Sequence, residues 1–138
     1  MELIFRNAKV KDRGNLIDIG IKDGKFEQIM TKINVEAKKE INAYGKFASA
    51  PFVESQVHLD SALSVGRPRF NESVTLLEAI NIWGAYKQTL TKEDIKKNAK
   101  KAVEWLVTNG VLRIRAHTDS TEPTLMTMEA ILELKEDM

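Results

Sequence analysis

The second part of the chain alternates strand and helix patterns, and this order restricts the fold more than any other feature. The elements are, in order, a strand within the apolar run 47–57, helices at 75–90 and 91–108, a strand at 111–117 and a helix at 124–135. Strand–helix–strand units connect parallel strands through crossover helices. The sequence therefore predicts an α/β fold with parallel strands.

The helix ends carry recognisable signals. Thr91 and Asp94 have the spacing of a capping box, Gly110 predicts the end of the second helix, and Pro123 predicts the start of the last one. One face of the second helix is apolar and predicts its buried side; it carries Ile95, Ala99, Ala102, Val103 and Leu106.

The last predicted helix has no Gly or Asn cap before Met138, and Glu136 and Asp137 lie where the helix dipole favours cations. These features predict a truncated series of βα repeats. We expect such a chain to leave apolar side chains of this helix in water, namely Leu125, Met128, Ile131 and Leu132.

The first part of the chain predicts a small antiparallel β-lobe at 1–46. Three strand patterns, at 3–10, 16–21 and 25–33, are separated by tight-turn residues. Asp23-Gly24 is a hairpin signal, since both central residues of such a turn favour positive φ. A sheet of so few strands cannot close into a barrel. Its free edge strands therefore need another segment to pair with them or cover them.

Composition excludes several classes of protein. The 138 residues carry a net charge of +1, which gives no reason to expect nucleic acid or a membrane as a partner. The absence of cysteine excludes disulfides, thiolate nucleophiles and Cys-ligated zinc. The N-terminus lacks the long apolar stretch of a signal peptide or membrane span, and a cytoplasmic protein is expected.

Both predicted parallel strands end in the same pattern, His-x-Asp. His58 and Asp60 end the first strand, and His117 and Asp119 end the second. In βα barrels this end of the strands carries the active site. A single histidine at a strand end is more often a packing residue than a ligand, so the spacing alone leaves both interpretations open.

Three segments resemble cytosine-deaminase-like members of the amidohydrolase superfamily. Residues 50–60, Ala-Pro-Phe-Val-Glu-Ser-Gln-Val-His-Leu-Asp, resemble the superfamily's first-strand motif Pro-x-Phe-Val-x-x-His-x-His-x-Asp. Residues 66–78 are similar to the family's Gly-x-Pro-x-Trp-Asn-x-Ser-Gly-Thr-Leu-Phe-Glu stretch. Residues 109–119 are similar to the family's strand containing Arg-Thr-His-Val-Asp. With the β-lobe included, the resemblance covers essentially the whole chain.

This resemblance implies a fold and an activity. The fold is a (β/α)8 barrel, of which residues 47–138 would form the first, truncated βα units and residues 1–46 part of a β-sandwich lobe. The activity is hydrolytic deamination of cytosine, a small pyrimidine-type substrate, to uracil and ammonia with a divalent metal ion, zinc or iron. The family's proton-transferring residues and later metal ligands fall beyond residue 138.

The resemblance implies a role in the site for individual residues of this chain. His58 has the position of a metal ligand, and Gln56 has the position of the first metal histidine. Leu76 would line the substrate pocket, with His117 and Asp119 near it. No residue of this chain takes the position of a catalytic acid or base.

The chain also departs from the family pattern. Gln56 replaces a strong imidazole donor with a weak amide oxygen, and Val74 and Ala79 replace glycines. Three hypotheses follow: a truncated, catalytically incomplete relative; one chain of a split enzyme completed by a second polypeptide; or a small binding or scaffold protein. The first predicts self-association unless a complementary chain covers the exposed sheet.

Overall fold

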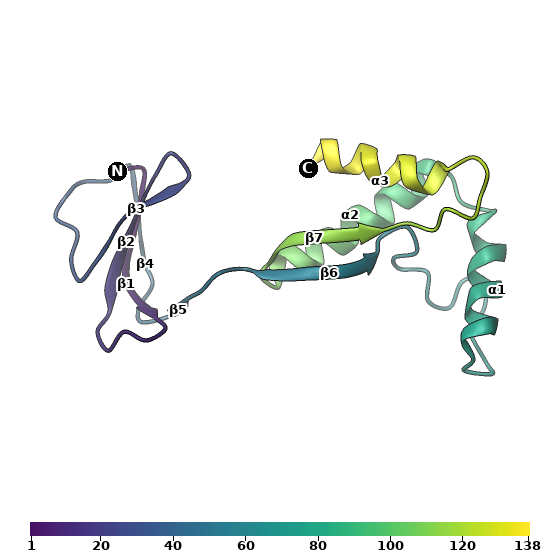
Figure 1. The fold of residues 1–138 in the computed structure, drawn as a ribbon, viewed down its shortest axis with the longest axis horizontal. Helices are drawn as coiled ribbons and strands as arrows, with labels where there is room; N and C mark the ends of the chain where they lie inside the picture. Colours follow the sequence, from purple (N-terminus) through teal and green to yellow (C-terminus); the bar gives the residue numbers. More distant parts are fainter. The chain divides into compact units, whose positions relative to one another are not determined.

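The computed structural model describes residues 1–138, which divide into two compact units, Met1–Ala50 and Pro51–Met138. Figure 1 labels the helices and strands of both units. Each unit is described by itself below. The structure is mixed α/β, with strands in both units and the three helices in the second.

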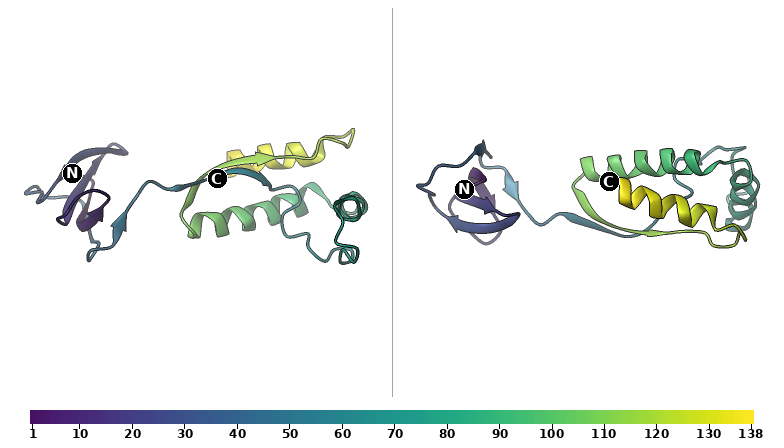
Figure 2. Two further views of the ribbon diagram at one scale, coloured as in Figure 1. Left: turned by 60° about the horizontal axis from the view of Figure 1, so that its bottom comes forward. Right: turned by 90° about the horizontal axis from the view of Figure 1, so that it is seen from above.

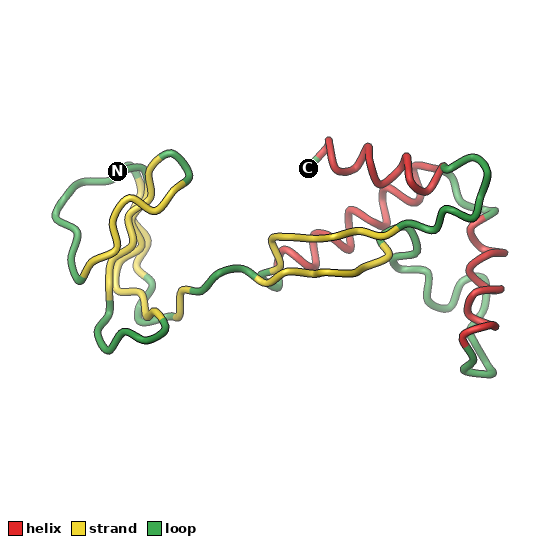
Figure 3. Tube along the Cα trace, viewed as in Figure 1, coloured by secondary structure: helices red, strands yellow, loops and turns green.

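The first unit is a five-stranded sheet in the order β3-β2-β1-β4, with β5 also paired to β1 (Figure 3). Its strands are β1 (Leu3–Val10), β2 (Ile17–Lys22), β3 (Lys25–Met30), β4 (Lys39–Asn42) and β5 (Phe47–Ala48). The predicted hairpin is confirmed, because Asp23 and Gly24 have φ of 50° and 68° between β2 and β3.

The prediction of a purely antiparallel lobe is wrong. Strands β1, β2 and β3 are antiparallel neighbours, but β4 and β5 both pair parallel with β1. Since β3 already runs in the direction of β1, the connection 31–38 crosses over and brings β4 to β1 in that same direction. The edge of β1 that was expected to need a cover is thus paired within the unit.

Buried aliphatic side chains and one buried carboxylate hold this sheet together. Ile4, Ala8, Ile17, Ile19 and Ile33 are at most 8% exposed. The side chain of Asp18 accepts hydrogen bonds from Arg6 at 2.7 Å and from the Ile33 amide at 3.0 Å. A buried carboxylate needs such donors, so this pair joins the first two strands to the chain after β3.

The second unit contains two parallel strands and three helices, in the predicted βαβα order. The elements are β6 (Phe52–His58), α1 (Leu76–Lys87), α2 (Lys92–Thr108), β7 (Val111–His117) and α3 (Met126–Asp137). The strand predicted within the run 47–57 is β6, which begins after Pro51, whereas Phe47–Ala48 forms a separate strand that pairs with β1. Proline has no N–H to donate, so it separates the two strands.

The predicted capping of α2 is confirmed. Thr91 and Asp94 form a reciprocal capping box, and Gly110 follows the C-cap with a φ of +85°. The predicted start of the last helix is wrong. Pro123 lies before the helix, whose N-cap is Leu125 in the left-handed region with no side-chain hydrogen bond.

Helices α2 and α3 pack together and against the strand pair (Figure 2). Leu59, Ala99, Val103 and Leu134 form the buried cluster. The expectation for α3 holds in part. Leu132 is 57% and Leu125 41% exposed, whereas Ile131 packs against the cluster. No helix in the structure is long and apolar enough to cross a membrane.

Candidate functional site

The parallel pairing of β6 and β7 brings the two histidines together. His58 and His117 are register partners at the carboxyl ends of their strands, and their ring centroids are 6.0 Å apart with a tilt of 39°. The His58 side chain is about half exposed, at 52%. Two imidazoles therefore meet at one edge of the strand pair.

Asp60 lies beneath this pair with a fully buried side chain. Its Oδ2 atom accepts a hydrogen bond from the backbone N–H of Asp119 at 2.6 Å. Its Oδ1 atom lies 3.5 Å from Nδ1 of His58 and has no other polar partner. One carboxylate thus connects the ends of both strands.

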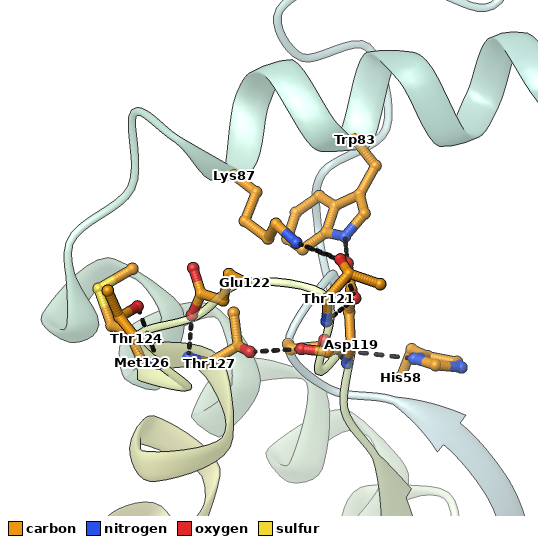
Figure 4. Close-up of polar contacts among 10 residues, drawn as sticks. His58, Trp83, Lys87, Asp119, Thr121, Glu122, Thr124, Met126 and Thr127 are labelled. Atoms are coloured by element: carbon orange, nitrogen blue, oxygen red, sulfur yellow. Dashed lines mark hydrogen bonds and ion pairs between the residues drawn. The ribbon is translucent and has the colours of Figure 1, made fainter.

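Asp119 links the end of β7 to helix α1 (Figure 4). Its carboxylate accepts hydrogen bonds from Lys87 Nζ at 2.7 Å, from Trp83 Nε1 at 3.3 Å and from the Thr121 hydroxyl at 2.6 Å. Burial by itself would raise the pKa of Asp119, but the hydrogen bonds from Lys87 and Thr121 outweigh it and hold that pKa well below its usual range.

Lys87, the cationic partner of Asp119, is largely buried. Its side chain is only 9% exposed, so its ammonium group depends on Asp119 and on the Thr121 hydroxyl at 3.1 Å. A buried charge without such partners would be strongly unfavourable. The network therefore fixes the last turn of α1 against the loop after β7.

A second set of contacts ties α3 to the same loop. The fully buried Thr127 donates its hydroxyl to the carbonyl oxygen of Asp119 at 2.8 Å. Its backbone N–H donates to Glu122 at 2.9 Å, so a glutamate satisfies a free amide in the first turn of the helix. Both flanking helices are thus attached to the residues that follow His117.

The other two predicted site residues are exposed. Gln56 lies on β6, and Leu76, the first residue of α1, is 77% exposed. A hollow of about 360 Å³ lies between the loop after β6 and α1, where Arg67, Phe70 and Trp83 are among the lining residues. Leu76 and the two histidines do not line it.

The residues present do not by themselves fit a divalent metal ion. No group of three or more His, Cys, Asp or Glu side chains is placed to hold one. A protein zinc site uses about three or four such ligands. Within this chain, His58 and the amide of Gln56 are the predicted donors, and a complete site requires ligands from outside these 138 residues.

Sequence reasoning did not identify Trp83, Lys87, Thr121 or Thr127 as part of this region. The repeated His-x-Asp pattern pointed to the two carboxylates, but it gave no sign that Asp60 is buried beneath the histidines or that Asp119 pairs with a lysine. A lysine in the last turn of a helix ordinarily lies in water and interacts favourably with the negative end of the helix dipole. Its burial depends on where α1 meets the β7 loop.

No protein-family model matches the chain, but individual relatives do. It is 32% identical over 142 aligned residues to an N-isopropylammelide isopropyl amidohydrolase of Pseudomonas sp. (strain ADP), covering 99% of this chain and 35% of that protein. A second relative, a 5-methylthioadenosine/S-adenosylhomocysteine deaminase of Aquifex aeolicus, is 35% identical over 47% of this chain and 15% of its own length.

Solved structures agree with these relatives. The chain superposes on a 5-methylcytosine deaminase of Klebsiella pneumoniae with a TM-score of 0.88 and 33% identity, over 97% of this chain and 33% of that one. An N-isopropylammelide isopropylaminohydrolase of Burkholderia multivorans has the same fold, with a TM-score of 0.78 at 20% identity. The chain spans about a third of the length of these proteins. It corresponds to the N-terminal portion of a cytosine-deaminase-like member of the amidohydrolase superfamily.

Proposed function

We propose that the chain forms the opening part of a hydrolase that removes an amino group from a pyrimidine-type ring such as cytosine. The observation that carries the proposal is the meeting of His58 and His117 at the carboxyl ends of two parallel strands, 6.0 Å apart. It is supported by the similarity to a 5-methylcytosine deaminase whose structures hold phosphonocytosine or 5-fluorocytosine.

In this proposal the two units are the parts that the resemblance implies. Residues 1–50, which include β5, belong to the β-lobe, and residues 51–138 supply the first βα units of a (β/α)8 barrel. His58 is a metal ligand and Gln56 occupies the neighbouring ligand position. Leu76, His117 and Asp119 belong to the substrate side of the site, where the contacts of Asp119 with Lys87 and Thr121 fix the loop after β7.

We further propose that the 138 residues are catalytically incomplete by themselves. Zinc or iron is the metal that the resemblance implies, and this chain supplies too few donors for it. The purified chain with added zinc, iron or manganese is expected to release no ammonia from cytosine. Ammonia release that scales with protein concentration and disappears on addition of a chelator would contradict this.

A chimera tests whether the segment fits the proposed enzyme. Residues 1–138 would replace the corresponding third of the Klebsiella 5-methylcytosine deaminase, and ammonia release from cytosine would be measured. We expect weak activity with Gln56 in place and higher activity in the Gln56→His variant, because imidazole is the stronger metal donor. His58→Ala in the Gln56→His background should abolish it.

The matched control is Ser55→Ala, the exposed neighbour on the same strand, which should leave the chimera unchanged. Far-UV circular dichroism would establish that every variant is folded. Activity in the folded chimera that does not respond to either His58→Ala or Gln56→His would refute the assigned metal positions.

The ring that is deaminated is a separate question. The similarity to the Pseudomonas protein over 99% of this chain supports N-isopropylammelide as a second candidate substrate. The chimera and its counterpart built on that protein should be assayed with both compounds. If both chimeras prefer the same substrate, the inserted segment selects the substrate. If each chimera keeps the preference of its parent enzyme, the remainder of the enzyme selects it.

The open strand pair also supports a requirement for a second polypeptide or a second copy. Phe52, Val53 and Leu112 are 69%, 63% and 61% exposed. Parallel strands are normally covered on both faces. Light scattering is expected to detect self-association of the isolated chain, relieved by a complementary chain. A monodisperse monomer with strong near-UV dichroism from Trp83 and Trp105 would favour the binding or scaffold hypothesis instead.

A further inference from the structure

The buried carboxylate of Asp60 has one oxygen that is satisfied and one that is not. Oδ2 accepts the hydrogen bond from the Asp119 amide at 2.6 Å, whereas Oδ1 has no hydrogen-bond partner although its side chain is fully buried. Leaving a buried acceptor unpaired is costly, because it has lost its contacts with water. A donor close to Oδ1 therefore gains from turning toward it.

Nδ1 of His58 is the nitrogen placed to be that donor. It lies 3.5 Å from Oδ1, within ion-pair range but beyond the usual length of an N–H···O bond. The imidazole is half exposed, so a small rotation about its side-chain bonds meets little resistance. Figure 4 shows the other ring nitrogen of His58 on the side away from this contact.

We infer that Asp60 is a positioning residue that holds His58 in the tautomer with the proton on Nδ1. A neutral imidazole carries one proton, so placing it on Nδ1 leaves a lone pair on Nε2. Free histidine favours the opposite tautomer, so the state inferred here is one that the protein must select. This inference does not depend on the proposed reaction, because it concerns a contact within these 138 residues.

The backbone link strengthens the selection. Asp60 is held in place by the Asp119 amide, and Asp119 is itself fixed by Lys87, Trp83 and Thr121. The carboxylate therefore cannot follow the imidazole outward into water without breaking a buried hydrogen bond. A fixed, buried carboxylate acceptor favours a donor facing it more strongly than a mobile surface carboxylate would.

Nitrogen-15 NMR of the ring nitrogens of the full chain, recorded about two pH units above the ordinary histidine pKa, tests this directly. We expect pyrrole-type Nδ1 and pyridine-type Nε2 signals for His58. In Asp60→Asn the amide oxygen can still accept from Asp119, while the amide NH2 faces His58 and donates to Nδ1. The tautomer ratio should then reverse, by roughly ten- to a hundredfold, the range expected for one hydrogen bond to a charged group.

His117 is the internal control, since the structure gives its ring no carboxylate partner, and its signals should not change between the two proteins. A His58 ring protonated on Nε2 in the unmodified chain would overturn the inference without any variant. The same result would follow from an unchanged Nδ1–H state in folded Asp60→Asn. If Asp60→Asn does not fold, the spectrum of the unmodified chain still decides the question.

Discussion

Strands β1 and β6 differ in how many strands pair with them and in how deeply they are buried. Strand β1 pairs with neighbours on both sides and buries Ile4 and Ala8 almost completely. Strand β6 has a single partner, β7, and contains no fully buried residue. The first unit thus pairs its central strands from within its own sheet. The second unit builds its core from helix packing and leaves much of its strand pair exposed.

This difference relates structure to the candidate site. The residues that hold the second unit together at the strand ends are charged and polar, and they converge on the loop after β7. The apolar strand positions Phe52, Val53 and Leu112 stay exposed. The second unit thus combines an exposed two-stranded sheet with a polar network at the carboxyl ends of its strands.

Truncating one apolar side chain in each sheet gives the largest expected contrast. Ile4→Ala should lower the free energy of unfolding of the first unit by about 2–5 kcal/mol, the usual range for a buried aliphatic residue. Val53→Ala in β6, where the side chain is 63% exposed, should cost less than about 0.5 kcal/mol. Hydrogen exchange of strand amides would measure both. A large loss for Val53→Ala would mean that this position is covered in solution.

Removing one charge of the Lys87–Asp119 pair should have the next largest effect. Asp119→Asn leaves a buried ammonium with weaker partners and should destabilise the second unit by about 3 kcal/mol, the lower end of the range for breaking a buried pair. The double variant Lys87→Met/Asp119→Asn should regain much of this loss, since no charge is then left uncompensated. Urea unfolding followed by Trp83 and Trp105 fluorescence reports on this unit. Equal losses in the single and double variants would contradict the proposed pairing.

Acid should destabilise both units, and the carboxylates whose pKa is lowered include Asp18 in the first and Asp119 in the second. Burial by itself would raise the pKa of Asp18, but hydrogen bonds from the Ile33 amide, Arg6 and the Asn7 amide hold that pKa below its ordinary value of 3.8, and Asp119 is lowered likewise. Such groups bind protons more tightly in the unfolded chain, so their stabilisation is present above the unfolded pKa and is lost as pH falls through the folded pKa.

Urea midpoints should therefore be flat near neutrality and should fall below about pH 4. Asp119→Asn should flatten the acid decline seen by tryptophan fluorescence and leave the decline of the β-lobe, followed by hydrogen exchange, unchanged. The comparison between the units is weakened if the variant changes both profiles.

Salt should produce the smallest effect, tested on the ion pairs between α2 and α3 of the second unit. Lys92 and Lys96 of α2 pair with Glu129, Glu133 and Asp137 of α3 at 2.8–3.2 Å, on exposed helix faces. Exposed ion pairs are screened, so raising NaCl from about 0.05 to about 0.5 M should lower the melting temperature only slightly. Lys96→Gln should remove about half of this response, because Lys92 keeps its two pairs. Lys101→Gln, whose pair with Glu104 lies within α2, is the control.

Local patterns explain which parts of the fold were predictable. The capping box at Thr91, the positive φ of Gly110 and the Asp23-Gly24 turn are each decided by neighbouring residues, and all are confirmed. The crossover that makes β4 parallel to β1 depends on where a loop passes over the sheet, which no short pattern records. The start of α3 also differed, because Glu122 and Asp119 bind Thr127 and set the helix beginning after Pro123.

The same distinction between local and long-range contacts applies to the candidate site. Strand-end position was sufficient to select His58, His117 and both aspartates from the sequence. Their roles in the structure depend on partners far along the chain: Asp60 meets the Asp119 amide, and Asp119 meets Lys87. Burial of a lysine or a carboxylate is a property of the packed unit, so spacing along the chain could not reveal it.

The separation of paired residues along the chain also sets an order of events during folding. Lys22 and Lys25 pair across a two-residue turn, whereas the bond between Asp60 and Asp119 closes a separation of 59 residues. The entropic cost of closing the longer loop exceeds that of the hairpin by about 2.6 kcal/mol for a flexible chain. The β2–β3 hairpin can thus form within microseconds, while β6 and β7 must wait for α1 and α2 to shorten the path between them. The two histidines consequently meet only at a late stage, after the helices that separate them in the chain have already formed.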